Sequence, residues 1–157
     1  YRISQVHRHL LPWPADPERP AGMPRGLIET VLDAPNGKLR LMTTHLEYYS
    51  PLQRMAQVQR IRELHLEASA RSRIFQPDPN LDAPYQLGFR PASSILCGDF
   101  NFAPDADDYQ ALLAPFEGGA PPFLDAWRVA NGKVARAPTT GLRTFGDVQE
   151  ESRKRFG

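Results

Sequence analysis

One carboxylate and one amide follow directly after a short apolar run in this chain. Residues 94–98 are Ser-Ile-Leu-Cys-Gly, and Asp99, Phe100 and Asn101 come next. A short apolar run that stops at a turn signal predicts a buried strand, and if the strand persists its alternation points Asp99 and Asn101 the same way. The carboxylate can hold a hard cation or accept a proton, and the amide can donate to a phosphate oxygen. The alternative is a strand end followed by an Asx turn, which needs no ligand.

A histidine stands near the end of another alternating run. Residues 39–46 predict a strand on which four residues share one face, namely Leu39, Leu41, Thr43 and His45. The imidazole of His45 can donate to an anion or act as an acid. It can equally be a structural residue at a strand end. His7 and His9 would share one strand face as zinc ligands, but no third ligand follows at a suitable spacing.

Two further strands and a hairpin are expected to position these groups. Residues 2–11 and 26–32 have the composition and alternation of strands. The dipeptide Asn36-Gly37 is a strong hairpin signal, so residues 26–32 and 39–46 are predicted to pair antiparallel. Clustered prolines in residues 12–24 and 76–91 predict irregular loops.

A long helix is predicted between the histidine and the Asp-Asn pair. Ser50 can cap it and Pro51 suits its first position, and it should run to about residue 70. An apolar stripe is predicted to face the core, formed by Leu52, Met55, Val58, Ile61, Leu64 and Ala68. A shorter helix, capped by Asp105 or Asp107, should extend to Leu113.

Composition is that of a globular protein with one domain. The 157 residues carry a net charge of +1, so no global field favours nucleic acid, although a local basic groove would suffice to bind it. Cys97 is the only cysteine, which excludes an intrachain disulfide, favours a cytoplasmic location and predicts a thiol packed in a buried strand. No apolar run approaches the ~20 residues of a transmembrane segment.

Four segments in the same order resemble the endonuclease/exonuclease/phosphatase superfamily of metal-dependent phosphoesterases. They are Thr-His-Leu at 44–46, Gly-Asp-Phe-Asn at 98–101, Asp-x-x-Arg at 125–128 and, more weakly, Ala-Pro-Thr-Thr at 137–140. The resemblance implies an α/β fold that is part of a two-sheet β-sandwich flanked by helices, a four-layer α-β-β-α architecture. Residues 1–157 would form a single partial domain, with an irregular tail over 136–157.

The resemblance also implies a catalytic set. Asp99 would orient or deprotonate the attacking water near a divalent cation, Mg²⁺ or Mn²⁺, with Asp99 and Asn101 as its expected ligands. Asn101 would hydrogen-bond the phosphoryl group, and His45 would donate to a phosphate oxygen or to the leaving group. Asp125 matches an aspartate that orients a catalytic histidine, although Asp is also a common helix cap. Arg54 and Gln57 match a family helix pattern that a solvated helix face explains equally well.

Parts of the family pattern are missing. An early metal-binding Glu and a late Asp-His segment are not found. We therefore expect a middle portion of such a domain, weak or inactive alone, whose exposed sheet edges favour self-association. The leading hypothesis is a Mg²⁺-dependent phosphoesterase acting on a phosphate ester, with nucleic acid among the candidate substrates. The alternative is a non-catalytic module on the same scaffold that binds a phosphorylated ligand or a protein.

Overall fold

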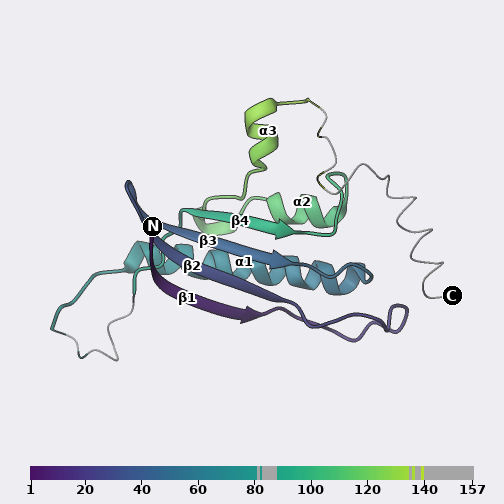
Figure 1. The fold of residues 1–157 in the computed structure, drawn as a ribbon, viewed down its shortest axis with the longest axis horizontal. Helices are drawn as coiled ribbons and strands as arrows, with labels where there is room; N and C mark the ends of the chain where they lie inside the picture. The colour runs from purple at the N-terminus through teal and green to yellow at the C-terminus, as the bar shows by residue number, and fades with distance from the viewer. Residues whose placement is uncertain (81, 83–87, 135, 137–138, 140–157) are drawn as a thin grey trace. The chain divides into compact units, whose positions relative to one another are not determined.

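The computed structural model describes residues 1–80, 82, 88–134, 136 and 139. The chain divides into two compact units, residues 1–123 and 124–157, and each is described by itself. The first unit is a mixed α/β structure in which one face of a four-stranded sheet is covered by a long helix (Figure 1). Most of the tail predicted at 136–157, and of the segment at 137–140, lies outside the described residues.

The sheet has the strand order β1-β2-β3-β4. Its strands are β1 (Arg2–Leu10), β2 (Gly26–Ala34), β3 (Gly37–His45) and β4 (Ser94–Asp99). The first three pair antiparallel, and the Asn-Gly turn joins β2 to β3 as predicted. β4 runs parallel to β3 after a crossover through the long helix. The carboxyl ends of β3 and β4 therefore meet at the same edge of the sheet.

The crossover helix α1 (Pro51–Ile74) starts as the sequence predicts. The hydroxyl of Ser50 accepts a hydrogen bond from the backbone N–H of Gln53 at 3.1 Å. The helix lies along the inner face of the sheet, as Figure 1 shows. Together with strand residues and Leu112, it forms a core of buried apolar side chains, namely Leu11, Leu27, Met42, Leu46, Val58, Ile61, Leu64 and Leu112. None of the helices within the described ranges is long and apolar enough to span a bilayer.

The strand carrying the Asp-Asn pair is not buried, which corrects the prediction for residues 94–99. β4 forms with the expected bounds, but it is an edge strand on which Ile95 is 50% exposed. Cys97 is exposed as well, so the prediction of a buried thiol is wrong. The apolar run at residues 94–98 predicted a buried strand. In the described residues, only the face of the sheet toward α1 is covered.

Two details of the helices also differ from the predictions. The inner face of α1 carries polar side chains, and Leu52 at its start is 51% exposed rather than part of an apolar stripe. The shorter helix, α2 (Asp107–Leu113), has Ala106 at its N-cap, with no side-chain cap from Asp105 or Asp107. A short 3₁₀ turn, η2 (Glu117–Gly119), follows α2.

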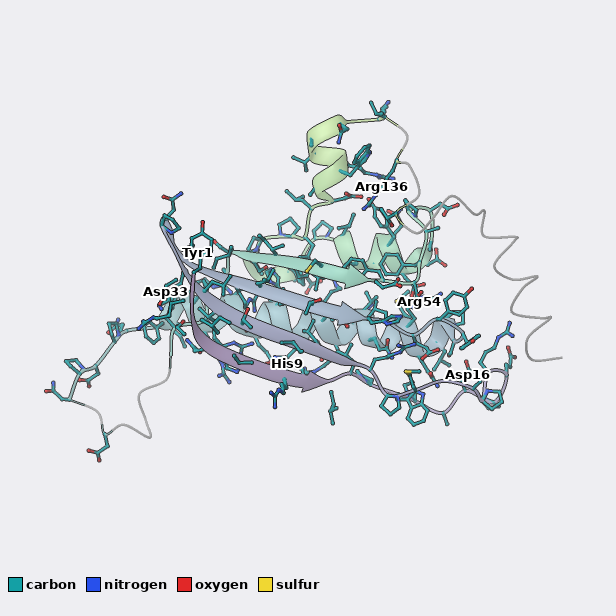
Figure 2. The ribbon with its side chains drawn as sticks, viewed as in Figure 1. Tyr1, His9, Asp16, Asp33, Arg54 and Arg136 are labelled. Atoms are coloured by element: carbon teal, nitrogen blue, oxygen red, sulfur yellow. The ribbon has the colours of Figure 1, made fainter. Side chains whose placement is uncertain are left out.

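A buried ionic cluster connects the inner face of the sheet to α1. The Glu29 carboxylate on β2 is fully buried and accepts two hydrogen bonds from Arg90, both 2.9 Å long. Burial acts to raise the pKa of Glu29, but the Arg90 hydrogen bonds and the charge of Arg40 outweigh it and hold the pKa below the ordinary value. His9 on β1, labelled in Figure 2, lies 3.5 Å from the same carboxylate.

His65 on α1 continues this cluster, and its hydrogen bonds fix which ring nitrogen carries the proton. A guanidinium nitrogen of Arg40 lies 2.5 Å from its Nδ1, and its Nε2 lies 2.8 Å from the carbonyl oxygen of Pro121. Because Arg40 can only donate, Nδ1 must accept and Nε2 must carry the proton. Burial lowers the pKa of His65, and the nearby positive charge of Arg40 adds to this effect.

We expect the protein to lose stability as the pH falls through the ordinary histidine pKa of 6.5. The unfolded chain binds a proton at His65 more readily than the folded chain does, so acid favours unfolding. Urea unfolding at about pH 7.5 and pH 5.5 measures the effect. The variant His65→Gln retains a donor for the Pro121 carbonyl and should reduce the pH dependence of the free energy of unfolding. The remaining pH dependence is expected from His7 and His9, because burial lowers their pKa values as well. An equal pH dependence in the variant would contradict this account.

Candidate functional site

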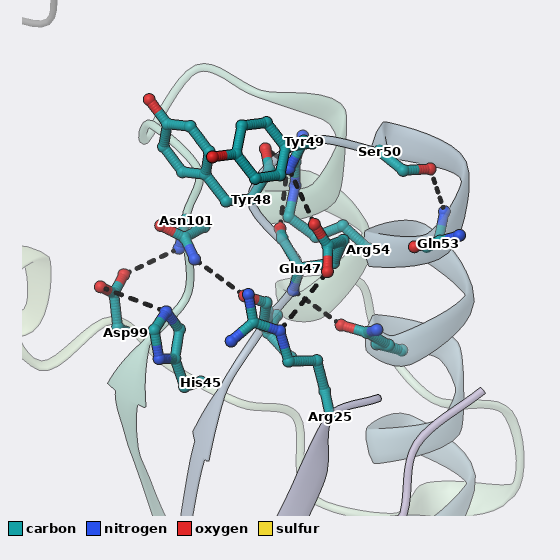
Figure 3. Close-up of polar contacts among 12 residues, drawn as sticks. Arg25, His45, Glu47, Tyr48, Tyr49, Ser50, Gln53, Arg54, Asp99 and Asn101 are labelled. Carbon is teal, nitrogen blue, oxygen red and sulfur yellow. Dashed lines mark hydrogen bonds and ion pairs between the residues drawn. The ribbon is translucent and has the colours of Figure 1, made fainter. Parts of the chain in front are cut away.

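The parallel pairing of β3 with β4 brings the predicted histidine and carboxylate together. His45 and Asp99 are register partners at the ends of the two strands, and the backbone N–H of Leu46 donates to the Asp99 carbonyl at 2.9 Å. His45 Nε2 lies 3.8 Å from Asp99 Oδ2, and the two side chains are 59% and 52% exposed. Two residues 54 positions apart in the sequence thus form one solvent-accessible pair (Figure 3).

Asn101 joins this pair through an Asx turn rather than through a continued strand. β4 ends at Asp99, and Asn101 has a φ of 52°, a left-handed conformation that Asn tolerates better than most residues. Its backbone N–H donates to Asp99 Oδ1 at 3.1 Å. Its side-chain Nδ2 donates to the Leu46 carbonyl at 2.8 Å. The Asx turn of the alternative is therefore observed, and the expected strand continuation is not. The turn still brings Asn101 next to Asp99, and the catalytic roles of these residues stay a prediction.

Gly98 permits the close approach of the two strand ends. It has a φ of 140°, and a Cβ at this position would lie 1.9 Å from the carbonyl oxygen of Thr44. No side chain fits there unless β4 moves away from β3. The glycine of the Gly-Asp-Phe-Asn segment is thus required by the backbone geometry that places Asp99 beside His45.

Arg25 lies at the same end of the sheet as His45 and Asp99, and the sequence analysis did not single it out. It directly precedes β2, and the register that pairs Leu27 with Thr44 would place Arg25 opposite Leu46 if it continued. In the view of Figure 3, its guanidinium is drawn between the side chains of His45 and Glu47. Counting back from the Asn36-Gly37 hairpin would have found it, because the hairpin fixes which residue of one strand faces which residue of the other.

Glu47 holds Arg25 and the segment after His45 in place. Its side chain is fully buried, and Oε2 lies 3.4 Å from Arg25 Nε. Burial acts to raise the pKa of Glu47, but hydrogen bonds from the backbone N–H groups of Tyr49, Met23 and Tyr48, with the charge of Arg25, hold the pKa below its ordinary value. Glu47 is thus an anion whose charge is neutralised inside the protein.

Arg54 and Gln57 support the same segment from α1, so a solvated helix face does not explain them. Gln57 is fully buried, and its Oε1 accepts from the backbone N–H of Glu47 at 2.9 Å. Arg54, labelled in Figure 2, donates to the Tyr48 carbonyl at 3.1 Å and to Asp108 Oδ2 at 3.1 Å. The segment after His45 is therefore fixed by buried hydrogen bonds to α1.

Asp125 belongs to the second unit, where it caps a short helix. Its Oδ1 accepts from the backbone N–H groups of Trp127 at 2.8 Å and Arg128 at 3.4 Å, at the start of α3 (Ala126–Asn131). Arg136 lies 3.8 Å from its other carboxylate oxygen. These contacts are those of a helix cap, and the orienting role implied by the resemblance stays a prediction.

The donor set around Asp99 suits only a loosely held divalent cation. No group of three or more His, Cys, Asp or Glu side chains that could hold a metal occurs in the part of the chain that the structure describes. Asp99 offers one accessible carboxylate and Asn101 an amide oxygen. Mg²⁺ commonly keeps several waters and binds through one or two carboxylates together with a substrate phosphate. Asp99 and Asn101 could therefore hold an ion that keeps several waters, but they could not fill its coordination shell with protein ligands alone.

No family model, curated protein or solved structure matches the chain. The function has to be inferred from the site itself.

Gly98→Ala should disrupt the site and destabilise the first unit by more than about 2 kcal/mol, since a Cβ cannot fit against Thr44 and the positive φ adds strain. Gly37→Ala is a matched control, because Gly37 also has a positive φ of 112° but nothing within 4 Å of the added Cβ. It should cost only about 1–2 kcal/mol. Urea unfolding of both variants measures the difference, and equal losses would refute a close-approach role for Gly98.

Proposed function

We propose that this chain contributes the phosphate-binding side of a Mg²⁺-dependent phosphoesterase site of the endonuclease/exonuclease/phosphatase type. The observation that carries the proposal is the convergence of His45, Asp99 and Asn101 at one solvent-accessible strand end. The guanidinium of Arg25, which is paired with the Glu47 carboxylate and drawn near this group in Figure 3, would add positive charge to the site. Phosphoesters hydrolyse slowly because negative oxygens shield the phosphorus, so a site must supply donors and positive charge to those oxygens.

Each side chain has an atom available for a defined role. Asn101 Nδ2 has two hydrogens, of which one is used on the Leu46 carbonyl and the other can donate to a phosphoryl oxygen. His45 Nε2 can donate to a second oxygen, or to the leaving group as it departs. The Asp99 carboxylate accepts one backbone hydrogen bond and keeps accessible lone pairs to orient the attacking water and take its proton. A bound Mg²⁺ would neutralise charge on the phosphoryl oxygens.

The proposed architecture includes a second sheet over the outer face of the observed one. His45 and Asp99 lie on that face. A row of paired residues on the same face is formed by Val6, Thr30, Leu41 and Ile95, and its members on β3 and β4 lie four residues before His45 and Asp99. Val6, Ile28 and Ile95 on this face are 54%, 47% and 50% exposed. An apolar sheet face of this kind favours a covering layer. A second copy covering this face would be self-association through the sheet face, whereas the sequence analysis predicted self-association through the sheet edges.

A non-catalytic phosphate-binding module is the second candidate. It is favoured by one observation. The group of His45, Asp99 and Asn101 contains one carboxylate, and no group of three or more metal-ligating side chains occurs among the described residues. The two candidates differ in turnover and in their response to chelators.

The assay follows hydrolysis of bis(p-nitrophenyl) phosphate with Mg²⁺ by a protein that contains this sequence. Asp99→Asn should lower kcat by roughly 10²- to 10⁴-fold, because the base that accepts the proton of the attacking water is lost. Asp105→Asn is the control, since Asp105 is exposed and acidic on the same connection after β4, and its rate should not change. Unchanged turnover in Asp99→Asn would refute the catalytic assignment. Ligand binding without turnover, unaffected by a chelator, would support the binding module.

Arg25→Gln should raise KM more than it lowers kcat, by roughly tenfold, if the Arg25 charge contacts the phosphate equally in the ground and transition states as proposed. Arg19→Gln provides the comparison, because Arg19 is an exposed cation on the same connection between β1 and β2, and it should leave KM unchanged. An unaltered KM in Arg25→Gln would show that the guanidinium serves only to neutralise Glu47.

A further inference from the structure

Two adjacent tyrosines lie beside the proposed phosphate site. Tyr48 and Tyr49 follow three and four residues after His45, and their rings meet edge to face with centroids 5.0 Å apart. Figure 3 shows both rings next to Asn101. This placement agrees with the hydrogen bond from the Asn101 side chain to the Leu46 carbonyl, two residues before Tyr48.

The backbone that carries these rings is hydrogen-bonded to buried groups, although the rings are not part of the core. Tyr49 is 50% exposed, while its backbone N–H donates to the buried Glu47 carboxylate at 3.0 Å. The Tyr48 carbonyl accepts from Arg54 at 3.1 Å, and Arg54 is itself paired with the buried Asp108. An exposed aromatic ring on a fixed backbone offers apolar area to a ligand at little cost in conformational entropy.

We propose that Tyr49, supported by Tyr48, stacks on the base of a nucleoside esterified to the phosphate bound at His45, Asp99 and Asn101. This inference rests on the proposed function and narrows its substrate class to nucleotide diesters. A planar base stacks on a tyrosine face without requiring a particular sequence. The net charge of +1 favours short or single-stranded nucleotides over a long duplex, whose binding depends on many phosphate contacts.

The experiment compares two ligands that share the phosphodiester and differ in the ring. Binding of dithymidine monophosphate and of dimethyl phosphate is measured by NMR titration of the chain, following the His45 ring and the Asn101 side-chain amide. The wild-type chain should bind the dinucleotide roughly 5- to 100-fold more tightly. Tyr49→Leu should abolish that preference and leave dimethyl phosphate binding unchanged, whereas Tyr49→Phe should retain it.

Tyr1→Leu is the matched control, because Tyr1 is 86% exposed and lies at the opposite end of β1 from the site. It should change neither affinity. Equal affinity of the wild-type chain for the two ligands, or an equal effect of Tyr49→Leu on both, would overturn the stacking proposal while dimethyl phosphate still shifts His45. If neither ligand shifts His45 or Asn101, the phosphate site and the stacking proposal are both overturned.

Discussion

The parallel pairing of β3 with β4 is the constraint on which the rest of this structure depends. The bond from the Leu46 N–H to the Asp99 carbonyl closes the ladder where the two strands end, so that an imidazole and a carboxylate separated by a long helix become neighbours. The pairing is possible only because Gly98 lacks a side chain at the point of contact with Thr44. A shift of one residue in this register would move Asp99 to the opposite face of the sheet.

Buried polar and charged side chains between the sheet and α1 support that pairing. The buried set includes the fully buried side chains of Glu29, Arg40 and Gln57 as well as aliphatic ones. Each charge there has a partner, as an isolated buried ion would be strongly unfavourable. Glu29 and Arg90 connect β2 to the residues before β4, and Gln57 connects α1 to Glu47. These directional contacts specify where β4 and the segment after His45 lie, which apolar packing alone would specify less sharply.

The features that sequence reasoning predicted well are those set by local chemistry. The hairpin at Asn36-Gly37, the Ser50 cap and the bounds of β4 depend on a few neighbouring residues. The exposure of Cys97 was missed because burial depends on what covers each face of the sheet. The contribution of Asn101 was expected from strand alternation but arises from a turn. Arg25 and Glu47 were not singled out, and the burial of His65 was not predicted, because their environments are created by residues distant in the sequence.

The most direct test of the account is a titration of the chain with inorganic phosphate, observed residue by residue by NMR. We expect the largest shifts at the His45 ring, the Asn101 side-chain amide and the Arg25 guanidinium, saturating together with one dissociation constant. His9 serves as the internal reference, because it too is a partly exposed histidine beside a carboxylate but does not belong to the proposed site. Its ring signals should not shift. Shifts that are absent at His45 and Asn101, or that saturate separately at these residues, would contradict the claim that they surround a single anion.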